Sequence, residues 1–273
     1  MALITISRGI GCGGLTISRL VADGLKLELY DDEKLHNEAI RMGLKPEAVT
    51  EMDEKAPGFF DMILNKHPDV YLDYMEAVVY EVAKRGEGVI VGHGSQVLLR
   101  DFECALHVRI QASEATRIQN LMKHRGVSEA AARKLIHKRD HEQRGFFRFA
   151  FHMDWNDPSL YDLIINTEQL GIDTAAHLIM EAARSDQIKA CSLNAIEAME
   201  RLSFKKRVHA ALLETDVNVS NLYVEVPEQG VVEISGFTES KEQKKRIGER
   251  LKALSGVSKV EDHIVVLDTV RGY

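Results

Sequence analysis

The sequence Leu-Ile-Thr-Ile-Ser-Arg-Gly-Ile-Gly-Cys-Gly-Gly-Leu-Thr spans residues 3–16 and joins a short apolar run to a glycine-rich turn. Apolar residues between Leu15 and Leu25 then follow a helical spacing, so the stretch predicts a strand, a turn and a helix. Glycines at such a turn accept positive φ and let successive backbone N–H groups approach an anion. The stretch therefore predicts a phosphate cradle, with a purely structural βα turn as the alternative.

The glycine spacing also matches most of a known nucleotide-binding pattern. From Gly9 to Thr16, G-x-x-x-x-G-x-T agrees with the P-loop at both glycines and at the threonine, whose hydroxyl would face Mg²⁺. Leu15 stands at the lysine position, so the charge that reaches the β- and γ-phosphates is missing. Arg8 either supplies that charge from another direction or packs with its tip in solvent. The predicted phosphate-binding residues are Arg8, Gly9, Gly11, Cys12, Gly13, Gly14, Leu15 and Thr16.

Length and composition favour a soluble globular protein of two domains. The chain has 273 residues, of which 45% are hydrophobic and 28% charged, and one domain usually takes about 100–200 residues. The net charge of −7 argues against general binding to a nucleic-acid backbone, which requires a basic surface. We therefore expect no nucleic-acid partner.

The cysteines and the N-terminal residues bear on location. Cys12, Cys104 and Cys191 are odd in number and lack metal-ligand spacing, which favours reduced thiols in a cytosolic protein over a disulfide framework. The N-terminus has no basic region or cleavage site of a secretion signal, and no apolar run approaches the length of a membrane span. We expect a cytoplasmic protein without a membrane span.

The order of the predicted elements indicates the fold class. Further strands are predicted at 27–30, 88–91, 105–110 and 160–165, and they alternate with helices at 69–85, 113–124, 128–148 and 172–184. This rhythm predicts βαβ units, and hence an α/β domain over residues 1–186 whose parallel sheet is covered by helices on both faces. Within it, residues 43–68 contain three prolines, and we predict short helices that form a mobile substrate flap.

Acidic residues follow the second predicted strand. Asp31 and Asp32 come directly after Tyr30, at the carboxyl end of a strand, where open α/β sheets place their ligands. The alternative is that one of these carboxylates caps the helix that begins near Glu33. The sequence leaves both interpretations open.

The helix predicted from Ser128 carries a dense set of cations. Arg144 and Arg148 share one helix face, and Asp140 lies one turn before Arg144. One interpretation is a solvated surface with an Asp140–Arg144 ion pair, and the other is a lid that closes on phosphates. The sequence Gly-Phe-Phe at 145–147 favours the lid, because it resembles a hinge.

Beyond residue 186 the pattern changes. We predict a linking helix at 187–202, and then a helix, two strands, a helix and a strand within residues 203–273. This order predicts a small α+β domain (αββαβ) with an antiparallel sheet. It shows no catalytic group of residues.

Together these motifs resemble two known families. Residues 3–182 resemble the cytidylate kinase-like family of P-loop proteins, and residues 203–268 resemble a BON domain. The first resemblance lies in Ile-Ser-Arg before the glycines, Tyr30-Asp31, Val-Ile-Val-Gly at 89–92, Arg117, Asp140-x-x-x-Arg144 and Tyr-Asp-Leu-Ile-Ile-Asn-Thr at 161–167. The second lies in Gly-Val-Val-Glu-Ile-Ser-Gly at 230–236 and Ser-Gly-Val-Ser-Lys-Val at 255–260.

The first resemblance implies a kinase that transfers the γ-phosphoryl group of ATP, with Mg²⁺, to a nucleoside monophosphate such as CMP. The glycines would hold the phosphates, and Asp31 would contact the acceptor or hold Mg²⁺ through water. The implied catalytic residues are Arg117, Arg139, Arg144 and Asp31, and the implied substrate-binding residues are Asp31, His93 and Arg148. The BON-like tail would bind a protein partner or self-associate.

Two departures from the family pattern support a rival hypothesis. The family usually has a basic residue where Leu15 stands and an arginine where His93 stands. Histidine is mostly neutral at pH 7 and lacks the bidentate fork of arginine, so both changes remove anion contacts. The rival is a degenerate P-loop regulatory or sensor protein that binds nucleotide with little turnover and whose tail reports the bound state.

Overall fold

A computed structural model describes residues 3–43, 68–188, 190–215 and 217–267. The described part of the first domain is built on a five-stranded parallel sheet in the order β2-β3-β1-β4-β5. Its strands are β1 (Leu3–Arg8), β2 (Leu29–Tyr30), β3 (Gly88–Val91), β4 (Ala105–Gln111) and β5 (Leu163–Asn166). The predicted parallel sheet is confirmed, and β1, which leads into the glycine loop, is its central strand.

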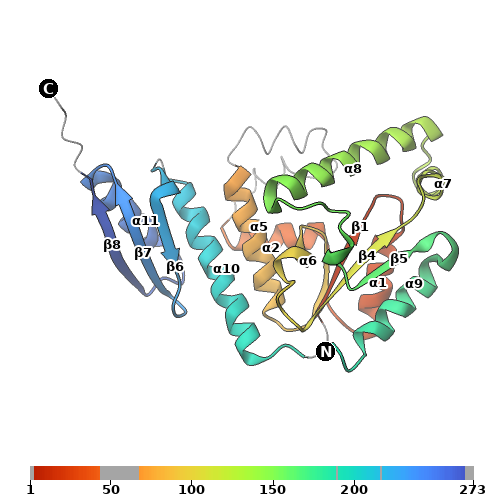
Figure 1. Ribbon diagram of the computed structural model, residues 1–273, viewed down its shortest axis with the longest axis horizontal. Helices are drawn as coiled ribbons and strands as arrows, with labels where there is room; N and C mark the ends of the chain where they lie inside the picture. The colour runs from red at the N-terminus through yellow and green to blue at the C-terminus, as the bar shows by residue number, and fades with distance from the viewer. Residues whose placement is uncertain (1–2, 44–67, 189, 216, 268–273) are drawn as a thin grey trace.

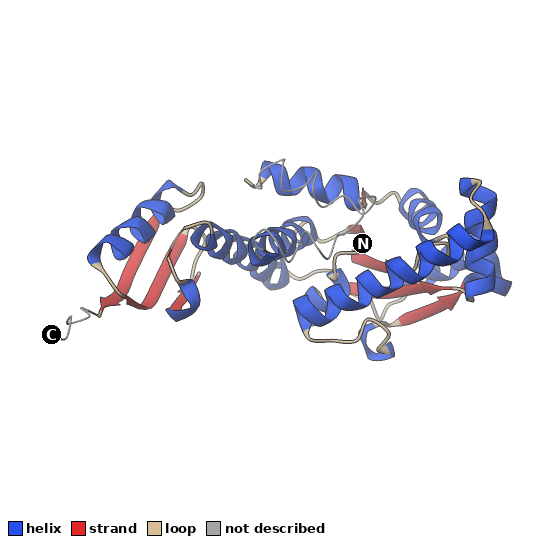
Figure 2. Cartoon of the chain, turned by 90° about the horizontal axis from the view of Figure 1, so that it is seen from above, coloured by secondary structure: helices blue, strands red, loops and turns tan. Residues whose placement is uncertain are grey.

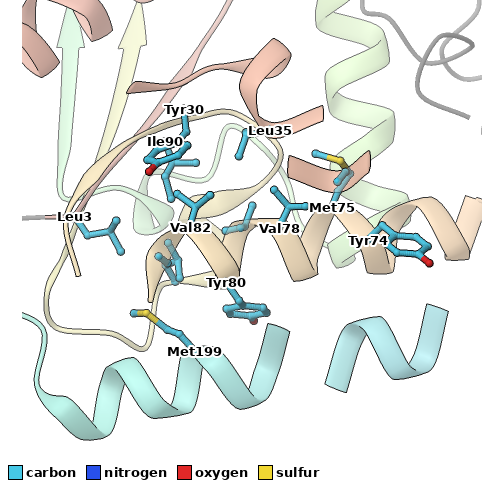
Figure 3. Packing of buried hydrophobic residues seen from close by; sticks show 14 of the residues in the cluster. Leu3, Tyr30, Leu35, Tyr74, Met75, Val78, Tyr80, Val82, Ile90 and Met199 are labelled. Carbon is cyan, nitrogen blue, oxygen red and sulfur yellow. The ribbon is translucent and has the colours of Figure 1, made fainter. Parts of the chain in front are cut away.

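Helices cover both faces of this sheet, as predicted (Figure 1). α1 (Gly14–Leu25) and α9 (Thr167–Ala183) pack on one face, and α2 (Asp32–Arg41) and α5 (Pro68–Ala83) pack on the other. Because strand side chains alternate between faces, Ile4 and Ile6 join the α1–α9 core whereas Leu3 joins the α5 core. Figure 3 shows Val78 and Val82 of α5 packed near Ile90 and Tyr30 of the sheet.

Three more helices follow β3 and β4 along the chain. They are α6 (Ser95–Leu98), α7 (Glu114–Arg125) and α8 (Glu129–Phe151), and α8 runs from the neighbourhood of α7 back towards α5 (Figure 1). The predicted hinge at 145–147 is wrong, because α8 continues unbroken to Phe151. Phe146, Phe147 and Phe151 contact one another edge-on, and this aromatic packing supports the last turns. The predicted flap at 43–68 lies almost wholly outside the described residues.

The tail domain has a mixed rather than an antiparallel sheet. Its elements are β6 (Leu222–Glu225), β7 (Val231–Thr238), α11 (Lys241–Ala253) and β8 (Lys259–Val266). β6 and β7 are antiparallel, but β7 and β8 are parallel. The antiparallel prediction fails for β8 because α11 acts as a crossover that returns the chain to the end where β7 began.

A single helix, α10 (Leu193–Leu213), replaces the predicted linking helix at 187–202 and the separate helix after it. Met199 and Ala210 belong to the α5 core, whereas Phe204, Val208 and Leu212 belong to the tail core. α10 accordingly stands between α5 and the tail sheet in Figure 1, and Figure 2 shows the two sheets separated by helices. The two domains therefore share a helix, and the predicted boundary at residue 203 falls inside it.

Cys104 and Cys191 form a disulfide, so the expectation of reduced thiols is wrong for these two cysteines. Cys104 precedes β4 and Cys191 precedes α10, which places the bond at the junction of the first domain with α10. Their separation of 87 residues gives no local signal, because the fold alone brings them together. Cys12 is free and buried. Among the described helices, none has the length and apolarity needed to cross a membrane.

Buried charges also hold α10 on α5. Nζ of Lys206 lies 3.1 Å from Oδ1 of Asp73 and 2.6 Å from Oε2 of Glu76, and His209 contacts the other oxygen of Asp73. Burial raises the pKa of Glu76, whose side chain is 9% exposed. Burial lowers the pKa of Lys206, but Glu76 and Asp73 together bring it above its ordinary value. The ammonium therefore stays charged between two buried carboxylates.

Replacing Lys206 by methionine should lower the free energy of unfolding by about 2 kcal/mol, because Asp73 and Glu76 lose their compensating charge. Removal of one partner of a fully buried pair costs about 3–5 kcal/mol, and the 33% exposure of the Lys206 side chain reduces this. Lys205→Met is the matched control: among the described residues the ion pair of Lys205 is with the exposed Glu225 at 2.9 Å, and its loss should change stability by less than about 0.5 kcal/mol. Equal losses in urea unfolding of both variants would contradict this account.

Candidate nucleotide-binding site

The loop after β1 leaves the N-terminus of α1 without a side-chain cap. α1 begins at Gly14, its N-cap is Gly13, and its first turn contains no acidic residue. By contrast, side-chain oxygens of Asp31, Ser113 and Ser128 cap α2, α7 and α8. The N–H groups of the first turn and the positive end of the helix dipole are thus left to an external acceptor. Such a terminus suits a phosphate group.

The loop glycines meet both a conformational and a spatial requirement. Gly11 and Gly13 have φ of 84° and 77°, in the left-handed region that glycine adopts most easily. A Cβ on Gly11 would lie 2.8 Å from the carbonyl oxygen of Arg117, and a Cβ on Gly14 would lie 2.5 Å from Cβ of Arg8. Side chains do not fit at these positions, so the backbone itself forms the binding surface.

Three side chains from outside this loop donate hydrogen bonds to its backbone carbonyl groups. Arg117 Nε, Asn120 Nδ2 and Thr167 Oγ1 donate to the carbonyl oxygens of residues 10, 11 and 12, at 2.7, 2.9 and 3.1 Å respectively. Sequence reasoning missed Asn120 and Thr167 as site residues. The available signals were the place of Asn120 one turn after Arg117, and the place of Thr167 directly after β5.

Arg117 lies directly beneath the cradle. Its Nη1 and Nη2 donate to the carboxylate of Asp140 at 2.8 and 2.7 Å. Burial lowers the pKa of Arg117, but Asp140 brings it above its ordinary value, so the guanidinium keeps its charge. The Asp140–Arg144 ion pair, one of the two interpretations of this helix, is not formed, because the Asp140 carboxylate is bound to Arg117. Arg144 Nε instead donates to the backbone oxygen of Asp140 at 3.1 Å.

The position of the missing lysine is at the surface. Leu15 is 39% exposed in the first turn of α1, so it does not pack under the loop as a core residue. Thr16, next to it, is also exposed. Cys12 differs from both, because it is buried and burial raises the pKa of its thiol. Cys12 therefore stays protonated and packs inside the loop.

On the β2–β3 side of the cradle, Arg8 and His93 meet at Asp32. Nη2 of Arg8 lies 3.0 Å from Oδ2 of Asp32, and Nε2 of His93 lies 3.1 Å from Oδ1. The ring of His36 contacts His93 edge-on, with centroids 5.5 Å apart. The structure thus brings the predicted Arg8 and His93 together at Asp32, one of the two carboxylates noted after Tyr30, and adds His36. The signal for His36 was its spacing of four residues from Asp32 at the start of α2.

Asp31 and His93 are both placed by the backbone around them. Oδ1 of Asp31 accepts a hydrogen bond from the backbone N–H of Lys34 at 3.2 Å, so the capping interpretation is confirmed for Asp31. His93 has φ of 51° between Gly92 and Gly94, which also have positive φ. A left-handed conformation is uncommon for a non-glycine residue, and here it fixes the position of the imidazole at the end of β3.

The remaining predicted cations lie along α8. Nη1 of Arg139 is 3.2 Å from Oε2 of Glu142, whereas Arg144 and Arg148 are exposed. Within the described ranges, none of the three donates a hydrogen bond to the glycine loop. They are connected to it indirectly, because Asp140 of the same helix binds Arg117.

The residues present fit a nucleotide polyphosphate. The glycine loop offers backbone amides at an uncapped helix terminus, which is the chemistry that P-loops use for phosphate. Mg²⁺ usually takes one or two protein oxygens together with phosphate oxygens and water, and the exposed Thr16 hydroxyl is a suitable ligand of this kind. Among the described residues, no group of three or more His, Cys, Asp and Glu side chains is arranged to hold a metal.

Comparison with known proteins agrees with this geometry. The family description "cytidylate kinase-like family" matches residues 3–169, and that of the BON domain matches residues 203–268. The cytidylate kinases of Pyrobaculum islandicum and Staphylothermus marinus are 26% and 25% identical over 182 residues, which cover 66% of this chain and 92% and 96% of the relatives.

The solved structure of an uncharacterized protein from Eubacterium ventriosum has a TM-score of 0.54 at 22% identity, and the match covers 68% of this chain and 99% of that one. This likeness supports the fold alone. The family match, by contrast, extends over more than half of the sequence and includes the whole glycine loop. The chain therefore belongs to the cytidylate kinase-like family of P-loop proteins, and it carries a BON domain in its C-terminal part.

Proposed function

We propose that the first domain transfers the γ-phosphoryl group of ATP to a nucleoside monophosphate, with CMP as the first acceptor to test. The observation that carries the proposal is the uncapped N-terminus of α1, preceded by a loop with room for backbone only. The names of the relatives support CMP as the acceptor.

Phosphoryl transfer requires in-line positioning and neutralisation of charge more than a nucleophilic side chain. In this proposal the loop holds the phosphates of ATP, and Arg139, Arg144 and Arg148 of α8 neutralise charge around the transferred group. Mg²⁺, held by Thr16, would supply further neutralisation when bound. Asp32, oriented by Arg8 and His93, lies on the acceptor side and positions the acceptor. Asp31 supports that side by fixing the start of α2.

A nucleotide sensor with little turnover is the second candidate function, and two observations favour it. Leu15 leaves the first turn of α1 without a cation, and the Nε, Nη1 and Nη2 groups of Arg117 donate to Ile10 and Asp140. In this reading the cradle binds ATP, but too little positive charge reaches the γ-phosphate for transfer.

A coupled assay of ADP release separates the two functions. The full chain is incubated with ATP, Mg²⁺ and each of CMP, UMP, AMP and GMP, and ATP binding is measured in parallel by calorimetry. The kinase proposal expects ADP release that depends on one or more monophosphates. Binding of ATP without any acceptor-dependent release would contradict it and favour the sensor.

Leu15→Lys should raise ATP affinity or turnover about tenfold, because an ammonium in the first helical turn adds a charge-assisted contact to the phosphate chain. The exposed position of Leu15 lets the lysine reach solvent, so the melting temperature should stay nearly unchanged. Leu20→Lys is a matched control, since Leu20 is similarly exposed (37%) but lies further along α1. If the protein is a kinase, its turnover should rise. If it is a sensor, only its affinity for ATP should rise. An equal effect of both lysines would show nonspecific attraction.

A further inference from the structure

The side chains behind the glycine loop also determine where its N–H groups point. The described chain contains no cis peptide bond, and in a trans peptide the carbonyl points away from the N–H group of the next residue. The carbonyl of Ile10 is bound to Arg117, and that of Cys12 is bound to Thr167. The N–H groups of Gly11 and Gly13 therefore point to the opposite side of the loop, away from α7 and α9.

We propose that Thr167 is a positioning residue for the phosphate chain, which it orients through the Cys12–Gly13 peptide without touching the ligand. Arg117 does the same for Gly11 through the Ile10–Gly11 peptide. The identity of the anion rests on the proposed function, but the orientation of the two peptides does not.

The surroundings of Thr167 make it suited to this role. It is 8% exposed and is the first residue of α9, which the side chain of Asn166 caps. Its hydroxyl lies 3.1 Å from the oxygen of Cys12 and 3.4 Å from that of Gln111 at the end of β4. The single hydroxyl proton is thus anchored between the sheet and the loop, with the shorter contact to the loop.

Packing of α9 against the loop also limits the conformations that the Cys12–Gly13 peptide can adopt. A Cβ on Gly13 would lie 3.1 Å from Cδ1 of Ile172, so α9 presses on the loop from a second direction. Across the described ranges, no protein group accepts a hydrogen bond from the N–H of Gly11 or Gly13. Both N–H groups are therefore free to donate a hydrogen bond to a ligand. Such a partner is expected, because buried and half-buried backbone N–H groups are nearly always hydrogen-bonded.

Thr167→Val tests the inference, because valine keeps the shape of threonine and removes the hydroxyl. We expect the affinity for tripolyphosphate and for ATP, measured by calorimetry on the full chain, to fall about tenfold. Thr167→Ser keeps the hydroxyl and should stay within about threefold of the wild type. In ¹⁵N spectra, the shift of the Gly13 amide on addition of tripolyphosphate should be large in the wild type and the serine variant, and small in the valine variant.

The result that overturns the inference is wild-type affinity of Thr167→Val, or an equal loss in the valine and serine variants, which would assign the effect to packing. If the valine variant does not fold, Arg117→Lys is a second test. It should reduce the shift that tripolyphosphate causes at the Gly11 amide more than the shift at the Gly13 amide. A wild type that binds tripolyphosphate but transfers no phosphoryl group would contradict the proposed function and leave this inference standing. A wild type that binds neither ligand would overturn both.

Discussion

Replacing Gly11 by alanine should weaken ATP binding at least about a hundredfold in a protein that still folds. The new Cβ would lie 2.8 Å from the carbonyl oxygen and 3.1 Å from Cα of Arg117. These are backbone atoms of α7, and moving them would disturb the helix. The loop must therefore shift instead. The φ of 84° adds strain of about 1–3 kcal/mol. Because the backbone N–H groups of the shifted loop then no longer point together at the phosphates, calorimetry should detect little or no ATP binding.

Gly126→Ala is the control for the strain alone. Gly126 also has positive φ, 66°, but a Cβ there would meet nothing within 4 Å. We expect a loss of about 1–2 kcal/mol of stability, the cost of a Cβ in the left-handed region, and unchanged ATP affinity. Normal ATP binding by Gly11→Ala would show that nucleotide does not bind at this loop.

Breaking the Cys104–Cys191 bond should lower the free energy of unfolding by about 2–4 kcal/mol, since the bond restricts the unfolded chain over a long loop. The bond spans 87 residues and fastens the segment before α10 to the start of β4. Because α10 contributes to both cores, its loosening should reduce the stability of both domains together. Urea unfolding of the oxidised wild type, the reduced wild type and Cys191→Ser measures the effect.

The reductant has its own control in the Cys191→Ser variant, whose unfolding should not respond to dithiothreitol. Thiol titration of the denatured, unreduced wild type should find one free thiol, that of Cys12. Three free thiols, together with an unfolding curve that dithiothreitol does not change, would contradict the bond.

The first domain could be predicted well from the sequence because its elements carry strong local signals. β3 is a continuous apolar run, β1 and β4 are rich in branched apolar residues, and the helix predicted at 113–124 is present as α7, directly after its cap Ser113. The tail was less predictable, since no glycine or proline breaks the chain between Leu193 and Leu213 to mark a shared helix. The direction of β8 depends on how α11 packs, which a linear pattern does not contain.

The candidate site shows the same division. Glycine spacing predicted the loop, and Gly11 and Gly13 have the predicted positive φ. Asn120 and Thr167 were missed because their places, one turn after Arg117 and directly after β5, do not by themselves show that the fold brings α7 and α9 against the glycine loop. Sequence spacing suggested Arg144 as a partner for Asp140 because it is near in the chain, whereas the observed partner, Arg117, comes from another helix. Local spacing favoured Arg144, but in the fold Arg117 donates two hydrogen bonds to the carboxylate of Asp140.

We infer that the loop at the N-terminus of α1 binds the phosphates of a nucleotide. Titration of the ¹⁵N-labelled wild-type chain with ATP and Mg²⁺, followed through the amide signals of residues 11–16, tests it most directly. We expect large, saturable shifts at Gly11, Gly13 and Gly14, and only small shifts in the tail domain. A folded protein in which saturating ATP leaves these amides unchanged would contradict the account.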